Sequence, residues 1–414
     1  MGLDTARHRA SHRRRHRRRT ARSHRVSTTS LDVAGPHLAA LVEQLKKAEA
    51  IRSARWAEAF AAVPRHVFVP SWYEMETNDK GISVWRMQHP MHEGNLPKVY
   101  RDITLVTALD PSTAEKVDTD AWTGVPTSSS TLPSLMAGML EDLHIQDGHR
   151  VLEVGTGTGY NAALLCTRLG EHLVHSIDID PELVSAAQSR LAKIGYEPQI
   201  VPGDGQAGYP TGERFDRIIA TCSVHRHLPA AWIEQTSPDG IIVADIALGI
   251  EGGLVRVSVD GDGRAFGHFT ATSGRFMAAR TDASTYPVQE RAPYAAETET
   301  RPTTVTASDI RANYPFRLLL ALELPDAEIV YNSADDGTMS LQFQRPDGTW
   351  ARSPLAGDAT VTYGGEADLW QTVEAAWQWW NEQGRPAHDR FGYAREPEGA
   401  ARVWHIPTGR RWNL

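Results

Sequence analysis

The stretch Val151-Leu-Glu-Val-Gly-Thr-Gly-Thr-Gly-Tyr160 decides the fold of this 414-residue chain. It opens with an apolar run short enough for a buried strand, and three glycines follow at alternate positions. Glycine lets the backbone turn tightly without a Cβ in the way of a ligand. Residues 161–169 then have the pattern of a helix. A strand, a glycine turn and a helix in this order predict a pocket for a nucleotide-type cofactor in an α/β sheet.

Three further predicted strands end in polar residues. The strand 173–177 leads into Asp178-Ile-Asp180, where an acid is placed to accept both hydrogen bonds of a ribose diol. The strand 199–201 stops at Gly203-Asp-Gly205, a turn suited to the edge of an adenine. The strand 215–220 opens into Thr221-Cys-Ser-Val-His-Arg226. Together these strand ends predict an S-adenosylmethionine site with a substrate-facing loop, and a dinucleotide site is the alternative.

The expected cofactor-binding residues all lie at these strand ends. Glu153 is placed either to face a cationic ligand or to hold the amides of the glycine turn, and Asp204 either contacts adenine or caps a turn. The full set is Glu153, Gly155, Thr156, Gly157, Gly159, Asp178, Ile179, Asp204, Gly205 and Thr221.

The order and wording of these segments resemble the protein-L-isoaspartate O-methyltransferase family. Pro64-Arg-His-Val-Phe-Val-Pro70 is similar to the family's upstream segment, and Tyr100-Arg-Asp102 with Leu105 to its cofactor-covering stretch. Residues 129–137 fall where the family has its Thr-Ile-Ser-Gln-Pro substrate segment. The resemblance spans about residues 36–250. It implies an α/β, Rossmann-like S-adenosylmethionine-dependent methyltransferase.

The chain departs from the family pattern around the substrate. Thr131 stands in place of the active-site serine, Leu132 replaces the glutamine, and a polar, acidic insertion precedes Ser128. With the long C-terminal extension, these features resemble a branch that accompanies lanthipeptide or graspetide synthetases. That resemblance implies esterification of an aspartate in a modified, cyclised ribosomal precursor peptide, leading through a succinimide to aspartimide or isoaspartate. Repair of isoaspartate in damaged proteins is the alternative.

The reaction itself needs no general base. A carboxylate with a pKa of about 4 is ionised at neutral pH, and a sulfonium methyl group is already electrophilic. Alignment of the two reactants dominates instead, with roughly 7–11 kcal/mol in the best oriented cases. Hydroxyl groups or a cation must hold the carboxylate. We predict Thr131 and Ser130 as catalytic residues and Ser129, His225 and Arg226 as substrate-binding residues.

These substrate assignments have structural alternatives. Residues 128–131 are also suited to cap the helix predicted over 132–143, and His225 with Arg226 to be solvated loop residues. Cys222 follows the fourth strand, where cytosine methyltransferases carry a nucleophile. It lacks their Pro-Cys setting, so a role as a small buried side chain is favoured.

Composition indicates the compartment and the partners. Two cysteines suggest a reducing environment, histidines lack metal-ligand spacing, and no apolar run approaches membrane length. We therefore expect a cytoplasmic enzyme without a metal. Residues 1–30 hold ten Arg and one acid, a charge of +9, so the remainder carries −8 − 9 = −17. We expect a disordered tail there and no nucleic-acid partner, although nonspecific nucleic-acid binding by the tail is the alternative.

Turn-forming residues and the spacing of apolar residues divide the rest of the chain into segments. A helix is predicted over 37–60, an irregular insertion over 72–122, and an aromatic helix over 366–383 whose tryptophans either form a core or bind peptide. The predicted organisation is an Arg-rich tail (1–30), an N-terminal helical region with the insertion (31–127), the methyltransferase core (128–275), a linker (276–308), and a C-terminal α+β domain proposed to bind the peptide (309–414).

Overall fold

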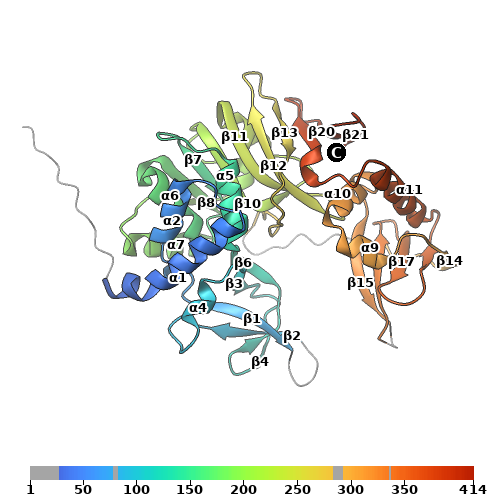
Figure 1. The fold of residues 1–414 in the computed structure, drawn as a ribbon, viewed down its shortest axis with the longest axis horizontal. Helices are drawn as coiled ribbons and strands as arrows, with labels where there is room; N and C mark the ends of the chain where they lie inside the picture. Colours follow the sequence, from blue (N-terminus) through green and yellow to red (C-terminus); the bar gives the residue numbers. More distant parts are fainter. Residues whose placement is uncertain (1–27, 78–82, 283–291, 335–336) are drawn as a thin grey trace, which may run out of the picture.

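The computed structural model describes residues 28–77, 83–282, 292–334 and 337–414 (Figure 1). The predicted disordered tail lies outside these residues, except that its last three positions begin a helix. The helices are α1 Thr28–Lys47, α2 Ala54–Ala62, α3 Arg65–Phe68, α4 Leu96–Val99, α5 Pro133–Asp142, α6 Tyr160–Leu169, α7 Pro181–Lys193, α8 Ala230–Glu234, α9 Ala307–Ala312, α10 Tyr314–Glu323 and α11 Leu369–Glu382.

A ten-stranded sheet forms the centre of the molecule. Its order is β21-β20-β19-β13-β12-β11-β10-β7-β8-β9. The last five strands in this order pair in parallel: β7 Val151–Val154, β8 Val174–Asp178, β9 Gln199–Pro202, β10 Phe215–His225 and β11 Thr236–Ala247. Helices α6 and α7 connect β7 to β8 and β8 to β9. These parallel strands and their connecting helices confirm the predicted fold class, a Rossmann-like α/β methyltransferase fold. The sequence predicted the strands because buried parallel strands have continuous apolar runs.

The N-terminal region differs from its prediction in two ways. The expected helix over 37–60 is two helices, since Ser53 caps a new helix by accepting a hydrogen bond from the Trp56 amide. The expected irregular insertion is a six-stranded sheet of order β4-β5-β2-β1-β3-β6. Its strands are β1 Trp72–Thr77, β2 Ser83–Gln88, β3 Leu105–Leu109, β4 Lys116–Asp118, β5 Ala121–Trp122 and β6 Pro126–Ser130. Half of the residues of β1 are exposed, so its sequence lacks the apolar alternation that would predict a strand.

The C-terminal half of the chain contributes strands to the central sheet as well as forming a sheet of its own. Strands β12 Gly252–Val259 and β13 Ala265–Phe269 extend the central sheet, and β13 pairs with β19 from the far end of the chain. The strands β19 Phe391–Arg395, β20 Ala401–His405 and β21 Arg411–Asn413 complete that sheet. One buried apolar cluster runs from the parallel strands into α10 and α11. Pairing between such distant segments leaves no local signal.

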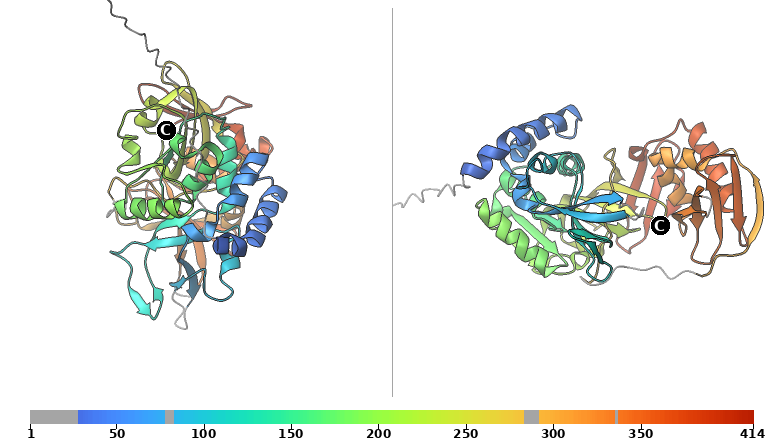
Figure 2. Two further views of the ribbon diagram at one scale, coloured as in Figure 1. Left: turned by 90° about the vertical axis from the view of Figure 1, so that its left-hand side faces the viewer. Right: turned by 90° about the horizontal axis from the view of Figure 1, so that it is seen from below.

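A third sheet, of five strands, has the order β14-β18-β17-β16-β15 and packs with α9, α10 and α11. Its strands are β14 Glu297–Pro302, β15 Glu328–Ser333, β16 Met339–Gln344, β17 Trp350–Pro354 and β18 Thr360–Gly364. Trp370 and Trp380 of α11 are buried, so its aromatic stripe is mainly core. Figure 2, seen from below, shows the N-terminal helices and this C-terminal unit at opposite ends of the molecule.

Metal-binding and membrane-spanning features were sought in the same residues. Across the described ranges, no three His, Cys, Asp or Glu side chains are grouped to hold a metal ion. No helix there is both long and apolar enough to cross a membrane.

Candidate functional site

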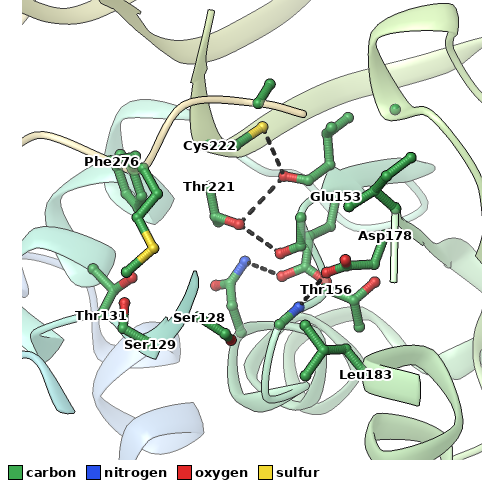
Figure 3. Close-up of a pocket in the computed structure, with 18 of the residues that line it drawn as sticks. Ser128, Ser129, Thr131, Glu153, Thr156, Asp178, Leu183, Thr221, Cys222 and Phe276 are labelled. Atoms are coloured by element: carbon green, nitrogen blue, oxygen red, sulfur yellow. Dashed lines mark hydrogen bonds between the residues drawn. The ribbon is translucent and has the colours of Figure 1, made fainter. Parts of the chain in front are cut away.

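A pocket lies at the carboxyl ends of the parallel strands (Figure 3). The glycine turn after β7 forms one wall, and the hydroxyl-rich residues 127–131 face it from β6 and its end. Residues 275–280, here called the strap, contribute a further wall. Figure 3 shows Ser129, Thr131 and Phe276 on one side, with Asp178 and Leu183 on the other.

The backbone comes close to the pocket because glycine occupies two crowded positions. Gly155 has a φ of +96°, and a Cβ there would lie 2.6 Å from the Thr221 Oγ1. A Cβ on Gly205 would lie 2.4 Å from the Val154 Cγ1. Gly159 is the one predicted cofactor-binding glycine that lies away from the cavity. It does not line the pocket, and its missing Cβ instead allows contact with Ala187 of α7.

Glu153 belongs to a buried hydrogen-bond network. Its Oε1 accepts from the Asn161 Nδ2 at 2.8 Å, and its Oε2 accepts from the Ser176 Oγ at 2.6 Å. Thr156 Oγ1 lies 2.6 Å from the same serine hydroxyl. Burial raises the pKa of Glu153 to about 7, although both hydrogen bonds favour the ionised form. Side chains, rather than the amides of the glycine turn, therefore engage this carboxyl.

The two predicted acids at the following strand ends line the pocket. Asp178 accepts hydrogen bonds from the Gly157 amide at 2.7 Å and the Asp180 amide at 3.1 Å, and burial raises its pKa. Asp204 caps the turn Gly205–Ala207 through a 2.9 Å bond from the Gln206 amide. Thr156, Gly157, Ile179 and Thr221 also line the cavity.

Arg65 fixes the substrate-facing segment, a role that the sequence analysis missed. It is fully buried, and burial lowers its pKa to about 10, so it stays charged at neutral pH. It donates to the Ser130 Oγ at 3.3 Å and to the carbonyls of Ser130 and Thr131, both at 3.1 Å. Further bonds reach the carbonyls of residues 99, 101 and 103. The signal was present as the arginine of the segment 64–70.

His225 and Arg226, which are predicted to bind substrate, do not line the pocket. Strand β10 continues to His225 alongside β11, which carries both residues past the cavity. The His225 side chain is exposed, and the Arg226 Nη2 donates to the Asp326 Oδ1 at 2.7 Å. Ser128, Ser129, Ser130 and Thr131 do line the cavity.

Cys222 lies in the pocket wall as a half-buried thiol. Burial raises its pKa to about 12. The thiol is therefore protonated at neutral pH and is a poor nucleophile.

Two buried polar atoms test the fit of a polar ligand. Among the described residues, neither the Asn161 Oδ1 nor the Tyr160 hydroxyl has a hydrogen-bond partner, and both residues line the cavity. Buried polar groups are rarely left unpaired. The Asn161 Oδ1, beside the glycine turn, is free to accept a hydrogen bond from an amino group. The carboxyl group of Asp178, at the end of the next strand, is placed to accept from the hydroxyls of a ribose. The hydrogen-bonding groups of the pocket thus fit S-adenosylmethionine.

Comparison with known proteins identifies the family. The sequence profile described as protein-L-isoaspartate(D-aspartate) O-methyltransferase matches residues 112–279. A protein-L-isoaspartate O-methyltransferase of Methanopyrus kandleri is 32% identical over 209 residues, which are 50% of this chain and 75% of that protein. The chain belongs to the protein-L-isoaspartate O-methyltransferase family. Because these methyltransferases depend on S-adenosylmethionine, the predicted cofactor is confirmed.

Other family members cover less of the chain. Those of Fervidobacterium nodosum and Rhodopseudomonas palustris are 40% and 42% identical over 28% and 32% of this chain. The chain spans 58% and 60% of the lengths of these two relatives. A solved protein-L-isoaspartate O-methyltransferase has a TM-score of 0.49 at 20% identity, covering 88% of this chain and 98% of its own.

Proposed function

We propose that this protein is an S-adenosylmethionine-dependent O-methyltransferase that esterifies a carboxylate of a peptide or protein. The observation that carries the proposal is that a hydroxyl-rich segment and the glycine turn of a methyltransferase fold line the same cavity. The first suits a carboxylate and the second suits the cofactor. The two free cysteines fit our further proposal that the enzyme acts in the cytoplasm.

The chain's residues hold and align the reacting carboxylate. S-adenosylmethionine, when bound, supplies an electrophilic methyl group. The substrate carboxylate is already ionised at neutral pH, so no residue has to remove a proton. We assign Thr131 and Ser130 to hold this carboxylate, with Ser129 beside them. Hydroxyl donors hydrogen-bond the carboxylate without neutralising it, and Arg65 fixes the backbone that presents them.

We further propose that the substrate is an aspartate side chain in a modified, cyclised ribosomal precursor peptide. The threonine at position 131 and the structure outside the matched residues 112–279 support this proposal. That structure includes strands β1–β3 and the five-stranded sheet. After esterification, the next backbone nitrogen attacks the ester carbonyl, methanol leaves, and a succinimide forms. Hydrolysis opens the succinimide to aspartate or isoaspartate.

Repair of isoaspartate in damaged proteins is the second candidate, because the similar proteins of Fervidobacterium nodosum and Methanopyrus kandleri are named protein-L-isoaspartate O-methyltransferases. Methylation of cytosine through a cysteine nucleophile is disfavoured, because burial raises the pKa of the Cys222 thiol. The arginine-rich tail, on which nucleic-acid binding would depend, lies outside the described residues.

One experiment separates the two carboxylate substrates. The purified enzyme and S-adenosylmethionine are given a cyclised ribosomal precursor peptide that contains an aspartate, with an isoaspartyl test peptide in parallel. Mass spectrometry then detects a methyl ester or loss of water. Modification of the precursor alone supports the biosynthetic function, and methylation of the isoaspartyl peptide alone supports repair. Modification of neither refutes both.

Variants at position 131 connect the result to the site. Thr131→Val keeps the shape of the side chain and removes its hydroxyl. We expect kcat/KM to fall roughly tenfold, as for a lost charged hydrogen bond, with unchanged cofactor affinity. Thr131→Ser, which restores the hydroxyl, is the matched control and should retain activity. Equal activity of all three proteins would exclude Thr131 from the reaction.

A further inference from the structure

The strap, residues 275–280, runs beside the end of β10 and forms part of the pocket wall. The Ser223 amide donates to the Met277 carbonyl at 2.9 Å, and the Ala279 amide donates to the Ser223 carbonyl at 2.8 Å. Phe276 faces the side of the cavity that carries Ser129 and Thr131 (Figure 3). The position of the strap therefore sets the shape of the cavity where methyl transfer is proposed.

Two carboxylates anchor the beginning of the strap. Asp245 of β11 has a fully buried side chain, and its Oδ2 accepts from the Phe276 amide at 3.0 Å and the Arg275 Nε at 3.1 Å. Glu251 accepts from the Arg275 Nη1 at 2.7 Å. The side chain of Arg275 thus lies between two acids, and one of them, Asp245, also accepts a hydrogen bond from the Phe276 amide.

The C-terminal unit supplies a second cation to this cluster. The Arg317 Nε of α10 donates to the other oxygen of Glu251 at 2.9 Å. Arg317 is itself fixed, because its Nη1 donates to the Arg311 carbonyl at 2.7 Å and its guanidinium lies 5.3 Å from the centre of the Tyr314 ring. A continuous chain of contacts therefore joins Arg317, Glu251 and Arg275.

Each carboxyl group of this chain of contacts is bonded by a guanidinium group. The cluster sets two carboxyl groups, those of Asp245 and Glu251, against two guanidinium groups, those of Arg275 and Arg317. These side chains are between 0% and 32% exposed, so water screens them poorly. Loss of Arg317 leaves the Arg275 guanidinium as the one cation among the described residues that bonds both acids, so Glu251 loses its second donor and competes more strongly with Asp245 for Arg275.

We propose that Arg317 and Glu251 are positioning residues that act through Arg275 to hold the strap against the pocket. The C-terminal unit thereby shapes the cofactor and substrate site, whether or not it also binds peptide. This inference rests on the proposed function only for its effect on methyl transfer. Deleting residues 309–414 would not test it, because that deletion also removes β19, the partner of β13.

Point variants and hydrogen exchange test the proposal without requiring turnover. Arg317→Gln and Glu251→Gln break the chain of contacts, and Arg311→Gln is the matched control because its side chain is exposed on the neighbouring helix α9. Mass spectrometry measures amide exchange in the peptide covering residues 275–280 of the full chain. We expect exchange at Phe276 and Ala279 to rise about threefold to thirtyfold in both broken variants, within the range of measured couplings, and not in the control.

Cofactor affinity and a conservative variant complete the test. The Kd for S-adenosylmethionine, measured by calorimetry, should rise in the same variants while kcat at saturating cofactor changes less. Arg317→Lys keeps the positive charge but lacks the planar guanidinium, so we expect its strap exchange and its Kd to lie between those of the unsubstituted protein and Arg317→Gln. If Arg317→Gln does not fold, Arg317→Lys takes its place in the test. Unchanged strap exchange in the folded variants, or an equal rise in Arg311→Gln, would overturn the proposal. A loosened strap without methylation of any peptide would refute the proposed function alone.

Discussion

Replacing Glu153 with glutamine should remove a pH dependence from the stability of the central sheet. Burial raises the pKa of this carboxyl from 4.5 to about 7, so the folded protein holds the proton more tightly than the unfolded chain. The corresponding stabilisation is fully present below pH 4.5 and is lost as the pH rises to about 7. A pKa difference of about 2.5 (7 − 4.5) corresponds to roughly 3 kcal/mol.

Glutamine suits this comparison because its amide replaces the protonated acid. Its oxygen is able to accept from the Asn161 Nδ2, and its NH₂ to donate to the Ser176 Oγ. That serine hydroxyl still has Thr156 as a partner, 2.6 Å away. The substitution therefore changes the ionisation with little change of shape.

Urea denaturation, followed by tryptophan fluorescence between pH 4.5 and 8, measures the effect. The difference in unfolding free energy between Glu153→Gln and the unsubstituted protein should move by about 3 kcal/mol in favour of the variant across this range. His388, whose pKa burial lowers to about 4, titrates in both proteins and cancels from the difference. Glu43→Gln, at an exposed position, is the control and should show no trend. A difference independent of pH would refute the reasoning.

Three other substitutions test the site. Gly205→Ala should weaken S-adenosylmethionine binding about tenfold or more in calorimetry, because its Cβ would lie 2.4 Å from the Val154 Cγ1 and push the turn into the pocket. Arg65→Ala should lower the free energy of unfolding by about 3–5 kcal/mol in urea titrations, since five buried or half-buried carbonyls lose their donor. Arg226→Gln should leave kcat/KM for the methylated peptide within about twofold, as expected for a cation outside the cavity. A tenfold loss would restore its predicted role.

The cofactor half of the site was readable from the sequence because its signals are local. A strand, its glycine turn and the acid that ends the next strand each occupy a few consecutive residues. Parallel strands present their carboxyl ends at one edge, so the order of such segments predicts which side chains converge. The exception, Gly159, shares the local pattern, but the packing of α6 against α7 directs it elsewhere.

The substrate half depended on strand register. Residues 221–226 read as a loop, yet pairing of β10 with β11 extends the strand and places Arg226 beside Asp326. A change of one residue in register would move these side chains to the opposite face, and nothing within the segment fixes that choice.

The sequence by itself thus determined the α/β core, the family and the position of the cofactor pocket, because each depends on short-range patterns. Only the tertiary structure decided that β19 joins β13, that Arg65 organises the segment 128–131, and that Arg317 reaches the strap through Glu251. These contacts join residues far apart in the chain. They form through packing and charge pairing once the sheets are assembled.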